Sequence, residues 1–264
     1  MDDERRDPWR FRGGLSEREL PREDAMIDAL THAERSAVGA AWSTRARAEL
    51  GAAVVFAMVA RTVLETPGPA ALHWLAARAP SDELRHAAIC RQVAARYLGH
   101  DAPWPEPPPS VEPRFDDLPD ETCRDLQVIV SCCVSETVAN AFLLASRARA
   151  EAPLVRAALR ELLRDEVDHA RVGWSFLAVP QVRARLLGPL TRALPALLEA
   201  VRVGWRERAR EYPERPPPGH GLLAPSETYD VVERCLDETV IPGFAHLGVD
   251  VSGAQRWRAQ RRSR

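Results

Sequence analysis

The sequence contains no lysine, so all 36 of its basic residues are arginine. With 38 acidic residues the formal net charge is −2, which gives no overall attraction to nucleic acid. The one basic cluster lies at residues 256–264. We expect it to belong to a frayed C-terminal tail of residues 251–264 rather than to a nucleic-acid-binding arm.

Paired cysteines and long apolar runs are also missing. The chain has five cysteines and no C-x-x-C pair, which indicates reduced thiols and excludes a rubredoxin-like or zinc-ribbon module. The N-terminal residues have no apolar segment, so we expect no secretory signal. The longest apolar run, residues 50–60, is too short to span a bilayer. Together these features predict a cytoplasmic protein without a membrane partner.

Aromatic residues make up only 6% of the chain, and alternating apolar and polar residues, the sign of a strand, are absent. Long alanine-, leucine- and arginine-rich segments predict an all-α protein instead. We expect helices over residues 34–65, 70–98, 120–150, 153–179, 181–211 and 226–247. Pro80 should kink or break the second helix before Glu83, and Ser81 or Asp82 could cap a new start there.

The connection between the second and third helices is long and rich in proline. Residues 99–119 could cover ~60 Å in polyproline form, at ~3.1 Å per residue. That is enough to run the length of a four-helix bundle, and such a crossover joins the two hairpins of ferritin-like bundles. The predicted organisation is a flexible N-terminal segment (1–33), a four-helix bundle (34–180), two additional helices (181–250) and the tail.

Two segments carry the same short pattern, Asp-Glu-x-x-His, at residues 82–86 and 165–169. On a helix, residues three apart share a face, so each glutamate and its histidine point the same way. Either segment by itself could be a solvated helix face. The repetition in two different helices favours a shared site.

A geometric argument adds two further glutamates. In a helical hairpin, residues equidistant from the turn lie at equal height, because both helices rise ~1.5 Å per residue. Reflecting Glu83 through the turn of the first hairpin gives Glu49, and reflecting Glu166 through the turn of the second gives Glu136. We therefore expect all four carboxylates at the same level of the bundle.

Four carboxylates and two imidazoles suit a pair of transition-metal ions, since carboxylates can bridge two metals while each imidazole caps one. The predicted metal ligands are Glu49, Glu83, His86, Glu136, Glu166 and His169. A ligating histidine usually donates its other N–H to a carboxylate. We expect Asp165 to serve His86 in this way, and Asp82 to serve His169.

This ligand set resembles the ferritin-like di-iron carboxylate superfamily, which includes rubrerythrins, the ribonucleotide reductase small subunit, bacterial multicomponent monooxygenases and the p-aminobenzoate N-oxygenase group. The resemblance covers residues 34–180. It implies two iron ions that activate O₂ to oxidise or oxygenate a small organic substrate, with an external electron donor. Manganese in place of iron and a homodimer stay open.

Three departures narrow that resemblance. Cys90 stands where the ribonucleotide reductase small subunit has its radical tyrosine, which argues against tyrosyl-radical chemistry of that type. Leu162 stands where the N-oxygenase group has a third histidine. A rubredoxin domain like that of rubrerythrin is missing as well.

Small residues lie on the predicted metal-facing stripes, including Ala46, which suggests either a substrate pocket or close helix packing. The candidate pocket residues are Ala53, Cys90, Cys132, Cys133, Asn140, Leu162 and Gly173. Asn140 could bind a ligand, and Arg45, one turn before Glu49, could pair with a carboxylate. Two alternatives to an oxygenase remain: an iron-oxidising, iron-storing or peroxide-consuming protein, and a metal-free helical scaffold.

Overall fold

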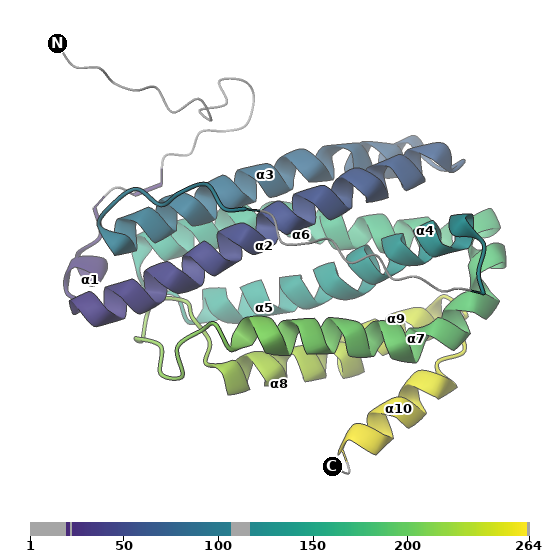
Figure 1. Cartoon of the computed structure of the whole chain (residues 1–264). Helices are drawn as coiled ribbons and strands as arrows, with labels where there is room; N and C mark the ends of the chain where they lie inside the picture. Colours follow the sequence, from purple (N-terminus) through teal and green to yellow (C-terminus); the bar gives the residue numbers. More distant parts are fainter. Residues whose placement is uncertain (1–19, 22, 107–116, 263–264) are drawn as a thin grey trace.

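The computed structural model describes residues 20–21, 23–106 and 117–262, and this part of the chain is helical with no β-strand (Figure 1). An isolated antiparallel bridge joins Ala150 to His220. The helical elements are α1 (Ala25–Asp28), α2 (His32–Glu65), α3 (Ala70–Leu98), α4 (Asp120–Val128), η1 (Ile129–Glu136), α5 (Thr137–Ala148), α6 (Pro153–Ala178), α7 (Pro180–Ala209), α8 (Pro225–Cys235), η2 (Leu236–Val240), α9 (Ile241–His246) and α10 (Ser252–Arg262).

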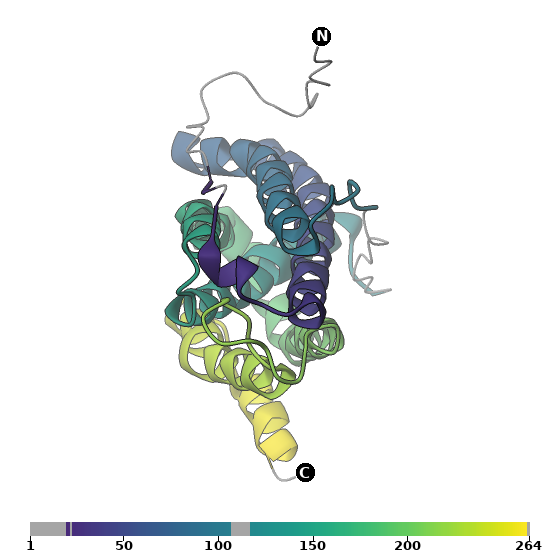
Figure 2. The same ribbon diagram turned by 90° about the vertical axis from the view of Figure 1, so that its left-hand side faces the viewer.

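Two long helical hairpins form the body of the protein. Helices α2 and α3 pack on each other, η1 and α5 pack on α6, and α4 contacts α2 and α7. Contacts between α3 and α6 join the hairpins, while α7 and α8 add a further layer on the side of α5 (Figures 1 and 2). The centre of the predicted crossover, residues 107–116, lies outside the described residues.

Local signals in the sequence account for the ends of the helices. Thr31 and Glu34 form a reciprocal capping box at the start of α2. Gly99 ends α3 with a φ of 76°, a left-handed conformation that glycine adopts without steric cost. Pro153 and Pro180 occupy the first positions of α6 and α7, where a missing N–H is harmless.

The predicted break at Pro80 is wrong, because α3 continues through it from Ala70 to Leu98. Proline removes one hydrogen bond, but the packing of α3 on α2 and α6 holds the helix on both sides of it. Asp82 does not cap a new start. Its carboxylate instead accepts a hydrogen bond from Nε of Arg78, at 2.8 Å.

The predicted third helix contains a feature that the sequence did not reveal. Residues Ile129–Glu136 form a π-helical segment between α4 and α5. Its side chains are buried except for partly exposed Ser135, and it packs on α6. Such wide turns are rare and are often found at functional sites. This one ends at Glu136, a predicted metal ligand.

The combined segment Asp120–Ala148 is apolar enough, over a sufficient length, to qualify as a candidate membrane span. It is the one such segment among the described residues, and most of its apolar window is buried inside the protein. Burial against α6 and α7 accounts for its composition as that of a core helix.

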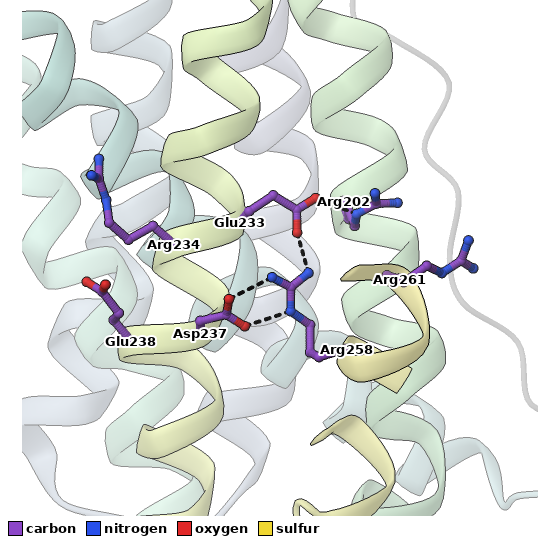
Figure 3. Close-up of a pocket in the computed structure, with 7 residues that line it drawn as sticks. All are labelled: Arg202, Glu233, Arg234, Asp237, Glu238, Arg258 and Arg261. Atoms are coloured by element: carbon purple, nitrogen blue, oxygen red, sulfur yellow. Dashed lines mark hydrogen bonds and ion pairs between the residues drawn. The ribbon is translucent and has the colours of Figure 1, made fainter. Parts of the chain in front are cut away.

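The C-terminal residues do not form the frayed tail that we predicted, since Ser252–Arg262 folds as α10 and contacts α7. Arg258 is buried, and its guanidinium binds Glu233 of α8 and Asp237 of η2 (Figure 3). Arg261 pairs with Glu199 of α7. Two basic residues of this segment, Arg258 and Arg261, thus have acidic partners within the chain.

Part of the predicted flexible segment 1–33 is ordered, because it contains α1 and the start of α2, while residues 1–19 and 22 lie outside the described residues. Asp24 is buried and caps α1 by accepting a hydrogen bond from the backbone of Met26. Its other carboxylate oxygen accepts one from Leu154 N at 3.0 Å, which ties this segment to the start of α6.

Candidate metal centre

Helices α3 and α6 bring the two Asp-Glu-x-x-His segments face to face in the middle of the bundle. Four side chains, Glu83, His86, Glu166 and His169, place one ligand atom each within 4.8 Å of one another. All four are at most 2% exposed. Two solvated helix faces would be exposed, so that reading of the segments is wrong.

The two central carboxylates each face both imidazoles. Glu83 places Oε1 2.9 Å from Nδ1 of His169 and Oε2 3.6 Å from Nδ1 of His86. Glu166 places Oε1 3.1 Å from Nδ1 of His86 and Oε2 3.4 Å from Nδ1 of His169. The arrangement has approximate two-fold symmetry, with a carboxylate on each helix reaching toward both histidines.

These close approaches do not have hydrogen-bond geometry. Both oxygens of Glu83, the Nδ1 atoms of both histidines and Oε2 of Glu166 are buried without a hydrogen-bond partner in the described part of the chain. Leaving so many buried polar atoms unpaired is costly. Oxygen and nitrogen atoms that converge without forming hydrogen bonds to one another are what is expected of metal ligands. The residues therefore fit a metal centre.

The outer nitrogens of the histidines face the aspartates that the sequence assigned to them. Nε2 of His86 lies 3.2 Å from Oδ2 of Asp165, and Nε2 of His169 lies 3.6 Å from Oδ2 of Asp82. Each aspartate therefore comes from the helix opposite its histidine. The contact with Asp165 fixes the ring orientation of His86, whereas Nε2 of His169 has no hydrogen-bond partner in the described part of the chain. In both rings Nδ1 is directed at the central carboxylates.

Two arginines that the sequence analysis did not identify hold these aspartates. Arg78 binds both Asp82 and Asp168, at 2.8 Å each, and thereby links α3 to α6. Arg85 binds Asp165 on α6 and lies 3.6 Å from Asp82. Arg78 lies four residues before Asp82 and Arg85 three residues after it, so both share a helix face with Asp82. This spacing could have identified them from the sequence.

The other two predicted ligands, Glu49 on α2 and Glu136 at the end of η1, flank this group without belonging to its closest four. Desolvation, followed by the charges of Glu83 and Glu166, raises the pKa of Glu49 to about 8. Desolvation and the same two charges also raise the pKa of Glu136 well above its usual value. Both carboxyls therefore lie in the field of the central glutamates.

A different histidine is prominent in the electrostatics of each flanking carboxyl. The charge of His86 lowers the pKa of Glu49, whereas the charge of His169 lowers that of Glu136, in both cases against the larger raising effects.

The pKa values of the central histidines and of Glu166 shift in opposite directions. Burial disfavours a charged imidazole, but the facing carboxylates outweigh it and raise the pKa of both His86 and His169 well above the usual value. Burial likewise opposes ionisation of Glu166, yet its contacts with the two histidines lower its pKa. The metal-free cluster relieves carboxylate repulsion by protonating its histidines and outer glutamates.

The candidate pocket residues are tightly packed. A Cβ on Gly173 would lie 2.6 Å from Cβ of Cys132 and 2.7 Å from the backbone nitrogen of Cys133, so this glycine allows α6 to approach η1. Packing, and not a substrate pocket, explains these three residues. Ala53, Cys90 and Leu162 are buried as well.

Half of the Asn140 amide has structural partners. Its Nδ2 donates to the backbone carbonyls of Glu136 and Glu166, at 2.8 and 2.7 Å. These bonds attach α5 to α6 directly behind two predicted metal ligands. Oδ1 of Asn140 is buried without a hydrogen-bond partner among the described residues, and its binding of a ligand stays a prediction.

Protein-family models, curated proteins and solved structures were all compared with the chain, and none of them matches it. The functional argument therefore depends on the geometry of the site.

Proposed function

We propose that this protein is a non-haem di-iron enzyme that activates O₂ to oxidise or oxygenate a small organic substrate. The proposal also assigns the two hairpins to a ferritin-like bundle. One observation carries it: two buried carboxylates each approach both of two buried imidazoles, without hydrogen-bond geometry. Such a ligand set suits two ions of a transition metal such as iron, with manganese as an alternative.

The residues divide naturally between two metal ions. Glu83 and Glu166, which face both histidines, would bridge the pair. His86 with Glu49 would hold one ion, and His169 with Glu136 the other. When bound, such a pair supplies a reducing centre at which O₂ can be activated.

Neighbouring side chains orient the proposed ligands, and burial keeps them away from water. Asp165 holds the outer nitrogen of His86, and Asp82 lies 3.6 Å from that of His169, so Nδ1 is the atom that each ring would present to a metal ion. Metal binding must displace the protons held by the histidines and by Glu49 and Glu136. Burial of all four central residues keeps bulk water away from the centre.

The test is to load metal-free protein with Fe(II) under anaerobic conditions and to count the bound ions. We expect about two per chain, followed by O₂ consumption when air is admitted. A Glu83→Ala variant should lose both. Binding of at most one ion, or a melting temperature that Fe(II) leaves unchanged, would favour a metal-free scaffold and refute the proposal.

A further inference from the structure

Arg45 is a buried side chain near the centre whose charge the site does not explain. It is only 5% exposed, and it lies one helical turn before Glu49 on α2. Neither Nη1 nor Nη2 has a hydrogen-bond partner in the described part of the chain. Arginine stays protonated in proteins, so a full positive charge is buried there with unused donors.

Aromatic rings surround this guanidinium but cannot satisfy it. Its central carbon lies 4.7 Å from the ring centroid of Trp42 and 5.1 Å from that of Phe142. Aromatic faces attract a cation, and more strongly when it is desolvated. They do not accept the in-plane N–H bonds, which require oxygen acceptors.

Trp42 adds a third unused donor at the same place. Its ring is 1% exposed, and its Nε1 has no acceptor among the described residues. Indole and guanidinium groups are donors only. The missing partner must therefore be an acceptor, and beside a buried positive charge an anionic acceptor is favoured.

Glu49, one helical turn away on α2, does not supply that anion, because neither Nη1 nor Nη2 of Arg45 forms a hydrogen bond with it. A buried charge without a counter-ion is destabilising, and an incoming anion would offset that cost.

We propose that Arg45 and Trp42 bind the carboxylate of the small organic molecule on which the metal centre acts. A planar guanidinium with two free terminal nitrogens matches a carboxylate, and the flanking rings suit an apolar or aromatic body. Neighbouring turns of a helix place side chains about 5–6 Å apart, so a molecule held by Arg45 lies next to Glu49. The assignment of this molecule as substrate rests on the proposed function, but the binding site does not.

The experiment titrates metal-free, full-length protein with benzoate and, as its neutral isostere, benzamide, by calorimetry at pH 7. We expect the dissociation constant of benzoate to be at least about 10-fold lower than that of benzamide, because only the anion compensates the charge of Arg45. Arg45→Gln should abolish this preference. Arg206→Gln is the matched control, since Arg206 also lies over an aromatic ring, that of Tyr229, but is exposed.

The outcomes are distinguishable from those of the metal test. Absence of benzoate binding to the wild-type protein, or equal binding of benzoate and benzamide, would refute the carboxylate site, whatever the iron content. The same holds if inorganic phosphate binds and benzoate does not. If Arg45→Gln fails to fold, the comparison of benzoate with benzamide on the wild-type protein still tests the carboxylate site. If benzoate binds through Arg45 but iron does not bind, the anion site stands and the oxygenase proposal fails.

Discussion

Oε1 of Glu83 lies 2.9 Å from Nδ1 of His169, although the two residues belong to different helices, α3 and α6. The contact is buried, and the histidine's other nitrogen is directed at Asp82. Each Asp-Glu-x-x-His segment is thus completed by the other one. Neither helix could form this site by itself.

The first prediction concerns His169. Replacing it with alanine should remove one imidazole ligand and abolish tight metal binding and O₂ consumption. The metal-free variant should still fold, because the helices keep the apolar packing of the core. Metal content, O₂ uptake and the melting temperature with and without Fe(II) provide the measurements.

His100→Ala is the matched control for this substitution, because His100 is exposed and lies after the end of α3. It should keep its metal and its stabilisation by Fe(II). Full metal content and activity in His169→Ala would show that residues 164–174 do not serve a metal centre.

Asp165→Ala should have a milder effect than removal of a ligand. Asp165 holds Nε2 of His86 and pairs with Arg85, but it does not face the centre of the site. Loss of such an orienting carboxylate typically costs about 10- to 100-fold in metal affinity or activity. Equilibrium Fe(II) binding, compared with the exposed-site variant Asp230→Ala, measures this directly. An unchanged affinity would remove Asp165 from the site.

Much of this centre could be predicted from the sequence because it depends on helical periodicity. Three-residue spacing predicts that Glu166 and His169 share a face, and the equal rise of paired helices predicts the level of Glu49 and Glu136. Both arguments depend only on backbone geometry that every α-helix shares. The structure accordingly brings Glu83, His86, Glu166 and His169 into one buried cluster, while the roles of Glu49 and Glu136 as ligands stay predictions.

The features that the sequence analysis missed depend on packing between helices. The π-helical segment before Glu136 is a local departure from helical geometry that periodicity does not reveal. Arg258 looked like part of a basic tail, because its partners Glu233 and Asp237 lie on other helices. Small residues such as Gly173 suggested a pocket, since a sequence does not show how closely two helices approach.

The close approach at Gly173 leads to a stability prediction. In Gly173→Ala the new Cβ would meet the backbone nitrogen of Cys133 at 2.7 Å, and backbone atoms cannot move aside cheaply. Such overpacking should destabilise the protein by about 1–3 kcal/mol, measured by urea unfolding of the metal-free protein.

Gly204→Ala supplies the comparison, because Gly204 lies inside α7 with no heavy atom within 4 Å of the added Cβ. It should stabilise the helix by about 0.5–1 kcal/mol. If both alanine variants were equally stable, α6 and η1 would not be in contact at Gly173.

The last prediction concerns pH and a buried pair that does not belong to the metal centre. Tyr97 and Nδ1 of His220 lie 2.6 Å apart and are buried. Burial raises the pKa of Tyr97, so its hydroxyl remains the donor and the neutral imidazole accepts. Burial also lowers the pKa of His220, and this effect outweighs the opposing charges of Asp24 and Glu34.

A lowered pKa in the folded state means that the unfolded chain binds a proton more readily than the folded protein does. The stability contributed by neutral His220 is therefore fully present above its unfolded pKa of about 6.5, and it is lost as the pH falls toward the folded value. His220→Gln keeps an acceptor for Tyr97 but cannot titrate. Between pH 7.5 and pH 5.5, urea unfolding should show a larger loss of stability for the wild type than for this variant. Equal losses would mean that His220 titrates alike in the folded and unfolded states, contrary to its burial against Tyr97.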